Sequence, residues 1–253
     1  MNRLENKVAV ITGASSGIGN SIARLFAAEG AKVVMFARRE KELNDTAAEI
    51  TANGGVAVVC PGDVSIQADV ERTLNTAIEK FGKVDIVVND AGMVRYNGGV
   101  AVVTDDECME LYAVNTMGAL RFCREAMKYM LPAGKGNFVF IGSVGGLLGH
   151  GGTAYAMTKG GMVSLARQIA VDYHREGIRS NVICPDGVMT MFGCVDGKWD
   201  MDPHTIKATT DHVCPDTPLC TPEEVANLAL FLASDESEAV NGQAIVIDHG
   251  ANL

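Results

Sequence analysis

Short runs of apolar residues alternate with longer amphipathic stretches along the chain, and this alternation constrains the fold more than any other feature. Strands that helices cover on both faces need continuous apolar runs, because neither face meets water. The alternation therefore predicts an α/β fold with a doubly wound, Rossmann-type parallel sheet in three layers. The predicted strands lie at 8–11, 33–36, 56–60, 86–88, 138–141, 182–184 and 244–247.

The chain of 253 residues shows no Pro-, Ser- or charge-rich linker, so we expect a single domain over residues 1–253. The alternation breaks at about 187–220, in a segment rich in Met, Gly, Pro and Asp. A long insertion in a compact domain is typical of a substrate-binding lid. Its large apolar side chains could line an adaptable pocket or merely fill gaps; they are Met189, Met191, Phe192 and Trp199.

Composition indicates which binding partners and which cellular compartment to expect. A net charge of −10 disfavours binding to nucleic acid or to an anionic membrane, so we expect small-molecule partners. The seven cysteines include no C-x-x-C pair, which favours a reducing cytoplasm over a disulfide framework or a zinc knuckle. No apolar run reaches the roughly 18 residues of a membrane span.

The histidines do not suggest a metal site. His150, His204 and His212 lack metal-ligand spacing, so we predict no metal. His150 follows Ser143 by seven residues and could instead border a substrate.

A glycine-rich turn, Thr-Gly-Ala-Ser-Ser-Gly-Ile-Gly at 12–19, follows the first predicted strand and precedes a helical pattern. Glycines let the backbone approach a pyrophosphate, whose charge the free N–H groups of the helix stabilise. Such a turn can also be purely structural. We interpret it as a cofactor loop, with contacts from Gly13, Ser15, Ser16, Gly17, Ile18 and Gly19.

Two arginines follow the second predicted strand, about twenty positions after the glycine loop, where dinucleotide folds place the residue that meets the adenine ribose. An acidic residue would bind the 2′-hydroxyl of NAD. Arg38 and Arg39 can instead pair with the 2′-phosphate of NADP through a planar, charge-assisted fork. We therefore predict NADP(H) rather than NAD; the alternative is that both arginines are ordinary solvated charges.

A phenol, an ammonium and a hydroxyl are predicted to converge. Tyr155 and Lys159 are four residues apart in a helical pattern over 153–173, so they share one face. Ser143 follows the predicted strand 138–141, and the carboxyl ends of such strands line the ligand crevice. A tyrosine and a lysine at this spacing are weak evidence alone, because such pairs also arise by coincidence.

In this order and spacing, the motifs resemble the short-chain dehydrogenase/reductase family, of the NADP-preferring type, over essentially the whole chain. Besides the glycine loop, the resemblance is carried by Asp63-Val64, Asn-x-Ala-Gly at 89–92, Asn115, Ser143, Tyr155-x-x-x-Lys159, and Pro185 with Thr190. It implies a catalytic set of Asn115, Ser143, Tyr155 and Lys159. It also implies a homotetramer, and further cofactor contacts from Asp63, Val64, Asn89, Ala91, Gly92, Tyr155, Lys159, Pro185, Val188 and Thr190.

The resemblance also implies how the catalytic residues work. Ser143 would donate a hydrogen bond to a carbonyl oxygen, and Tyr155 would supply the proton to the new alcohol. Lys159 would stabilise the phenolate and hold the ribose. Asn115 would support a water that links Lys159 to solvent.

Several functions fit. The first is interconversion of a secondary alcohol and a ketone, with a hydroxysteroid or bile-acid-type substrate as one candidate. The second is a 3-oxoacyl carrier-protein reductase. The third is a cofactor-binding regulatory protein without turnover, against which the joint presence of Ser143, Tyr155 and Lys159 counts.

Three positions depart from the family pattern. Asp90 replaces the second Asn of the usual Asn-Asn-Ala-Gly, Asp186 replaces the glycine after Pro185, and His249 replaces a glycine near the C-terminus. We expect Asp186 to repel the cofactor phosphates unless it turns away or meets a cation.

Overall fold

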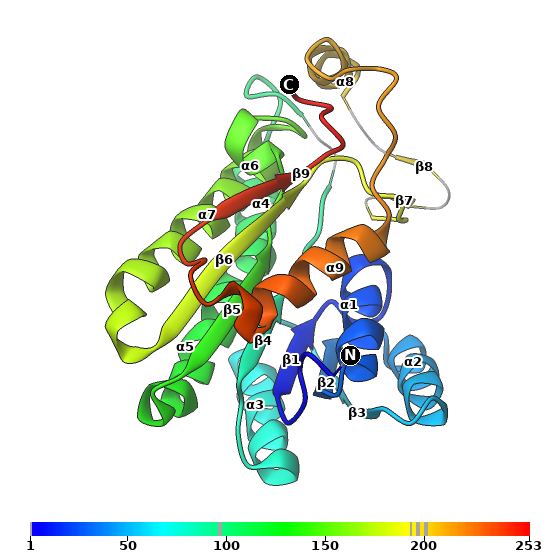
Figure 1. The fold of residues 1–253 in the computed structure, drawn as a ribbon. Helices are drawn as coiled ribbons and strands as arrows, with labels where there is room; N and C mark the ends of the chain where they lie inside the picture. The colour runs from blue at the N-terminus through cyan, green and yellow to red at the C-terminus, as the bar shows by residue number, and fades with distance from the viewer. Residues whose placement is uncertain (1, 96–97, 193, 196–197, 200–201) are drawn as a thin grey trace.

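A seven-stranded parallel sheet forms the centre of the computed structural model, which describes residues 2–95, 98–192, 194–195, 198–199 and 202–253 (Figure 1). Its strand order is β3-β2-β1-β4-β5-β6-β9, so the direction of winding reverses beside β1. The strands are β1 Val8–Thr12, β2 Lys32–Ala37, β3 Val56–Pro61, β4 Ile86–Asn89, β5 Gly136–Ile141, β6 Ile178–Pro185 and β9 Ala244–Ile247. All seven predicted runs form strands, and the α/β, Rossmann-type fold is confirmed.

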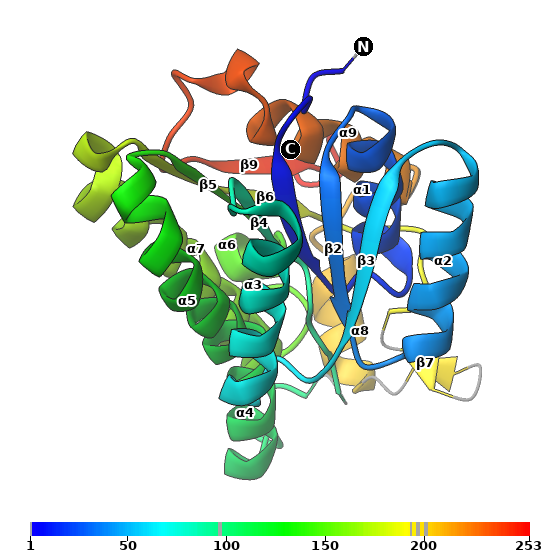
Figure 2. The ribbon, with the colours of Figure 1, turned by 90° about the horizontal axis from the view of Figure 1, so that it is seen from below.

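Helices cover both faces of the sheet and complete the three layers (Figure 2). One face carries α1 Gly17–Ala28, α2 Glu40–Ala52 and α9 Pro222–Ala233; the other carries α3 Gln67–Phe81, α5 Met117–Ala133 and α7 Thr153–Tyr173. Each face has its own apolar core. Phe26 is fully buried in the first, and Phe36 packs edge-on against Phe122 in the second, with ring centroids 5.0 Å apart.

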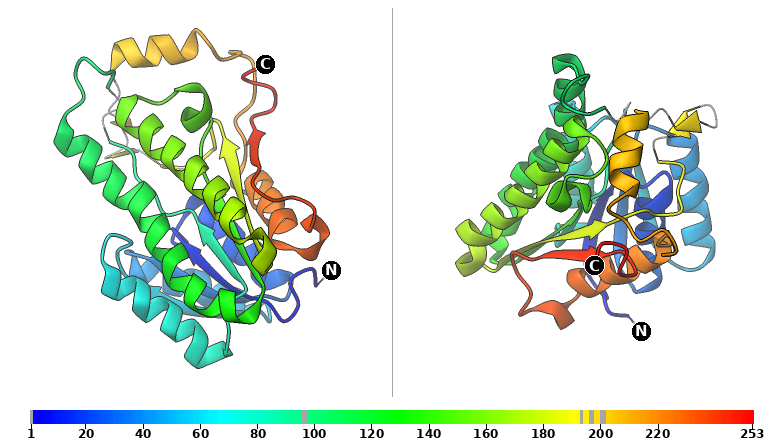
Figure 3. Two further views of the ribbon diagram at one scale, coloured as in Figure 1. Left: turned by 90° about the vertical axis from the view of Figure 1, so that its left-hand side faces the viewer. Right: turned by 90° about the horizontal axis from the view of Figure 1, so that it is seen from above.

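The remaining elements are short. They are α4 Asp105–Leu111, a π-helix at Tyr112–Thr116, α6 Gly145–Leu148, 3₁₀ turns at His174–Glu176 and Asp235–Ser237, the antiparallel pair β7 Cys194–Val195 and β8 Lys198–Trp199, and α8 Pro203–Thr210. The segment 187–220 contains β7, β8 and α8 and lies beyond the carboxyl ends of the strands (Figure 3). Among the described residues, no helix is both long and apolar enough to span a bilayer.

Helix starts follow local sequence signals. The N–H of Glu224 donates to Thr221 Oγ1 at 3.2 Å, and the N–H of Thr221 donates to Glu224 Oε2 at 2.7 Å, which completes the capping box of α9. Thr104 caps α4 by accepting the N–H of Glu107. These bonds fix where α9 begins, beside the end of β9.

Candidate active site

The glycine loop passes so close to β4 that side chains larger than hydrogen would collide there. Gly13 has φ of +73°, and a Cβ at this residue would lie 2.6 Å from Asp90 Oδ2. A Cβ at Gly19 would lie 2.5 Å from the same oxygen. Ser16, the N-cap of α1, makes no side-chain capping bond to the described residues. Ser16 therefore leaves the N–H groups of the first turn uncapped, as an anionic phosphate needs, although Asp90 accepts the N–H of Gly19.

Thr12 joins this loop to the segment after β4, a role that motif reasoning missed. Its hydroxyl accepts the N–H groups of Asp90 and Ala91, at 3.1 and 3.0 Å. The side chain of Asn89 points instead into the core, where Nδ2 donates to Cys123 Sγ at 3.4 Å. Its backbone remains beside the loop, while its amide contributes to packing.

The two arginines that are predicted to contact the adenine ribose phosphate lie beside the glycine loop. The guanidinium of Arg39 donates to Ser15 Oγ at 3.0 Å and also bonds to Ser16 Oγ. Arg38 is exposed beside it. After β3, Asp63 Oδ1 accepts the N–H and hydroxyl of Ser65, at 2.8 and 2.7 Å. The carboxylate thereby fixes the turn that carries the buried Val64.

The predicted hydroxyl, phenol and ammonium converge where β5 ends and α7 begins. Ser143 Oγ accepts the N–H of Gly145 at 3.0 Å and also hydrogen-bonds to the Tyr155 side chain. Lys159 Nζ donates to the carbonyl of Ile141 at 2.8 Å and lies 5.7 Å from the centre of the Tyr155 ring. The helix spans Thr153–Tyr173 as predicted, so both side chains point from one face.

Burial controls the protonation of this group. It raises the pKa of Tyr155 to about 12, an effect that the hydrogen bond to Ser143 opposes. Burial lowers the pKa of Lys159 to about 8, whereas the Asp90 carboxylate raises it. Asp90 itself has a pKa raised by burial, which the Lys159 charge and the N–H of Gly19 partly offset. The phenol is protonated at neutral pH, and Asp90 helps to keep the ammonium charged.

Asn115 lies in the π-helix at Tyr112–Thr116 and connects two parts of the site. Its amide donates to Met93 O at 2.9 Å and to Thr158 Oγ1 at 3.0 Å, and its Oδ1 accepts the N–H of Met93. Single-turn π-helices often occur at functional sites. The predicted support of a water stays a prediction.

The residues after β6 reach the same region. The carbonyl of Pro185 accepts the N–H of Val144 at 2.9 Å. A Cβ at Gly17 would lie 3.3 Å from Thr190 Cγ2, so the segment after β6 touches the glycine loop. The ring of Phe192 lies 6.3 Å from that of Tyr155. Val188 pairs with Cys220 in an isolated bridge, and the side chain of Trp199 lies outside the described residues.

The histidines singled out by sequence share one pocket. His150, His204 and His212 line it, between α8 and the turn that precedes α7. Leu148 and Ala156 add apolar surface. The pocket lies beside the start of the helix that carries Tyr155, and a substrate contact of His150 stays a prediction.

The other two departures from the family pattern face the C-terminal tail. Asp186 Oδ2 accepts a bond from Asn252 Nδ2 at 3.0 Å, and the same amide donates to Asp248. His249 has φ of +52°, and its Nε2 lies 3.2 Å from Glu224 Oε2. Asp186 therefore has an uncharged partner in the tail, and its expected repulsion of the cofactor phosphates stays a prediction.

Residues 13–252 match a family model described as Enoyl-(Acyl carrier protein) reductase. The 3beta-hydroxysteroid dehydrogenase 2 of Eggerthella lenta is 36% identical, over 98% of this chain and 95% of that protein. The chain belongs to the short-chain dehydrogenase/reductase family. The meso-2,3-butanediol dehydrogenase of Serratia marcescens is 36% identical over 98% of this chain and 96% of its own. The crystal structure of levodione reductase, 30% identical, aligns with a TM-score of 0.87 over 97% of both chains.

The predicted family resemblance is confirmed. Members of this family bind NAD(P), and the chain is an oxidoreductase. The choice between the two nicotinamide cofactors and the identity of the substrate are matters for proposal.

Proposed function

We propose that this protein is an NADP(H)-dependent oxidoreductase that interconverts a secondary alcohol and a ketone. The observation that carries the proposal is the convergence of Ser143, Tyr155 and Lys159 where β5 ends and α7 begins, with the Lys159 ammonium 5.7 Å from the centre of the phenol ring. Two relatives bear the names of a hydroxysteroid dehydrogenase and a butanediol dehydrogenase, both of which denote alcohol oxidation.

The side chains divide the chemistry between them. NADP(H), when bound, supplies or accepts the hydride. Ser143 Oγ donates a hydrogen bond to the substrate carbonyl oxygen, a bond that strengthens as negative charge develops there. Tyr155 gives its phenolic proton to the same oxygen. The raised pKa of the buried phenol keeps that proton in place at neutral pH, and the Lys159 ammonium is placed to stabilise the phenolate that remains.

The residues around the glycine loop fit a dinucleotide phosphate. The start of α1 presents backbone N–H groups beside the glycine loop, and Gly13 and Gly19 let this loop pack closely against Asp90. Arg38 and Arg39 stand at this loop as cations for a 2′-phosphate. The remaining proposed contacts, for the adenine, the ribose and the nicotinamide, are Asp63, Val64, Ala91, Gly92, Lys159, Pro185, Val188 and Thr190.

Apolar side chains of the lid favour a hydrophobic substrate. Phe192 lies against Tyr155, and Met189, Met191 and Leu219 are exposed in the lid segment. A sterol or bile-acid-type ring system would bury these groups. The description of the matching family model keeps a 3-oxoacyl carrier-protein reductase as the second candidate. The net charge of −10 favours the first, because an acidic carrier needs a basic docking face.

The same proposal includes the assembly and the compartment. We infer one domain over residues 1–253 that works as a homotetramer in the cytoplasm. Exposed apolar side chains on α4 and α7, Met109 and Met157 among them, offer surface that copies of the chain could bury. Light scattering on the purified protein measures the assembly, and a monomer would contradict it.

An absorbance assay with NADPH and NADH tests the function. Cyclic and steroidal ketones, small diketones and an acetoacetyl thioester are offered with each cofactor. We expect oxidation of NADPH with a ketone, at a higher kcat/KM than with NADH. Exclusive use of the thioester would select the second candidate, and tight cofactor binding without turnover on any substrate would favour a regulatory protein.

A further inference from the structure

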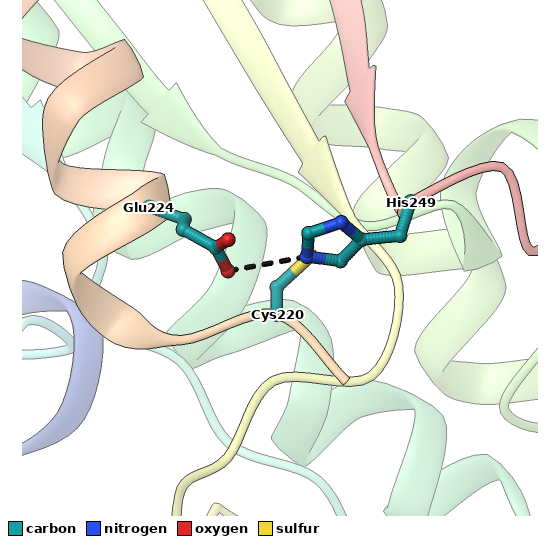
Figure 4. Close-up of side chains that lie close together, drawn as sticks. All are labelled: Cys220, Glu224 and His249. Atoms are coloured by element: carbon teal, nitrogen blue, oxygen red, sulfur yellow. Dashed lines mark hydrogen bonds and ion pairs between the residues drawn. The ribbon is translucent and has the colours of Figure 1, made fainter. Parts of the chain in front are cut away.

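A thiol, a carboxylate and an imidazole meet beside the start of α9, outside the proposed catalytic residues. Figure 4 shows the side chains of Cys220, Glu224 and His249 directed toward one another. One ligand atom of each residue lies within 4.8 Å of the other two. His249 Nε2 and Glu224 Oε2 are already in contact at 3.2 Å.

The backbone holds all three residues in place. Cys220 donates its N–H to Gly187 O and accepts the N–H of Met189, both at 2.9 Å. Glu224 is fixed by the capping box of α9, which uses Oε2. His249 follows β9 in a left-handed conformation that favours glycine. An imidazole held in a glycine conformation, at a position where the family pattern has glycine, calls for a function.

Charge around the thiol favours a cation. Cys220 is 1% exposed. The carboxylates of Glu224, Asp248 and Asp186 lie close enough to act on it electrostatically. A divalent ion would offset this acidic charge, and a cysteine binds such an ion as the thiolate.

We propose that Cys220, Glu224 and His249 bind a divalent transition-metal ion of the zinc class, with water as the fourth ligand. Sulfur, nitrogen and oxygen ligands in one site suit Zn²⁺, whereas Mg²⁺ and Ca²⁺ prefer oxygen alone. Tetrahedral ligands of Zn²⁺ lie about 3.3–3.7 Å apart. The 4.8 Å limit is thus within reach of small side-chain rotations. On binding, the thiol gives its proton to solvent and becomes the thiolate ligand.

Such an ion would act as a clamp rather than in catalysis. Cys220 pairs with Val188 at the base of the lid, Glu224 starts α9, and His249 begins the tail. One ion would therefore join the lid base to the C-terminal tail. The proposal does not depend on the proposed function, because binding is measured without turnover.

Metal binding to the chelator-treated full chain tests the proposal. Zn²⁺ affinity is measured by competition with a chromophoric chelator, stoichiometry by elemental analysis, and thiolate ligation by the charge-transfer absorption of bound Co²⁺. We expect one ion per chain, a thiolate-to-cobalt band, and a rise in Tm of about 5–10 °C at a hundredfold excess over Kd. No binding by the wild-type chain would overturn the proposal.

Three variants remove one ligand each without an obvious cost to folding. His249→Gly suits the backbone conformation, Glu224→Gln can keep the capping box, and Cys220→Ser is nearly isosteric. Each should weaken Zn²⁺ binding at least about tenfold, since even outer-sphere partners are worth that much. Cys214→Ser, which removes an exposed thiol near the tail, is the matched control. Binding that survives all three changes, or that Cys214→Ser abolishes, would refute the assignment.

Discussion

The proposed cofactor and catalytic region has two halves, one formed by backbone and the other by side chains. The half beside β1 is backbone: Gly13 and Gly19 lie against Asp90 where any Cβ would collide. The half beside β5 depends on a few side-chain atoms of Ser143, Tyr155 and Lys159. The contrast teaches that binding and chemistry can be separated. An added side-chain atom at Gly13 or Gly19 should impair binding or stability, whereas removal of a reacting atom such as the Tyr155 oxygen should stop turnover.

Removal of the phenolic oxygen has the largest expected effect. Tyr155→Phe should lower kcat by about 10²–10⁴-fold, because it removes the transferable proton and keeps the ring. The measurement is steady-state turnover of the best ketone with NADPH. Tyr173→Phe, at the other end of α7, is the control and should retain wild-type activity. A loss smaller than about tenfold would mean that another group supplies the proton.

Loss of the two arginines comes next. The double variant Arg38→Gln/Arg39→Gln should weaken the preference for NADPH over NADH by at least roughly ten- to a hundredfold, which is the effect of losing one charge-assisted contact to the 2′-phosphate. The kcat/KM values for both cofactors are compared at fixed ionic strength, since salt screens exposed charges. Lys41→Gln removes a nearby exposed charge, bound to Asp45, and should change neither value. An unchanged ratio in the double variant would identify both arginines as solvated charges.

An added methyl group probes the backbone half. Gly19→Ala should cost about 1–3 kcal/mol in stability or in cofactor binding, because its Cβ would lie 2.5 Å from Asp90 Oδ2 and 2.7 Å from Gly13 O. Thermal unfolding and NADPH titration report the two costs. At Gly99 the nearest atom is 3.7 Å away, so Gly99→Ala should be close to neutral. Equal effects at both positions would show that the loop is not closely packed.

The smallest expected effect is on the pH dependence of stability and comes from Asp90, which packs against the glycine loop and interacts with Lys159. Its folded pKa lies above the unfolded value, so the folded chain keeps a proton that the unfolded chain has lost. The stability of the wild type therefore falls as pH rises from about 4 to about 7. Asp90→Asn has no carboxyl group to titrate at this position. Its Tm should therefore rise relative to that of the wild type as the pH increases from about 4 to about 7. A difference independent of pH would show that Asp90 titrates normally.

Sequence predicted the sheet and the convergence of Ser143, Tyr155 and Lys159 well, because both depend on local patterns. The apolar runs located all seven strands, and the spacing of Tyr155 and Lys159 placed them on one helix face. The strands β5 and β6 are longer than predicted. Their extra residues include Asn137 and Asn181, which are buried and donate to carbonyls of Leu232 and Val240. Those partners lie far along the chain, so no local pattern reveals them.

Other features of the site depend on contacts between distant elements. The position of Asp90 under the glycine loop and the orientation of Asn89 into the core appear only once β1 and β4 are paired. The π-helix around Asn115 has no sequence signal that we used. The meeting of Cys220, Glu224 and His249 was missed because it joins two elements that are far apart in the sequence.

The dissociation constant of NADPH from Tyr155→Phe tests the central claim most directly, because it asks whether binding and chemistry are separate. Nucleotide fluorescence on the purified variant and the wild type gives both values. We predict a Kd within about threefold of wild type, a difference below about 0.7 kcal/mol, while turnover is lost. A loss of NADPH affinity as large as the loss of turnover would contradict the division of the site into a backbone half that binds and a side-chain half that reacts.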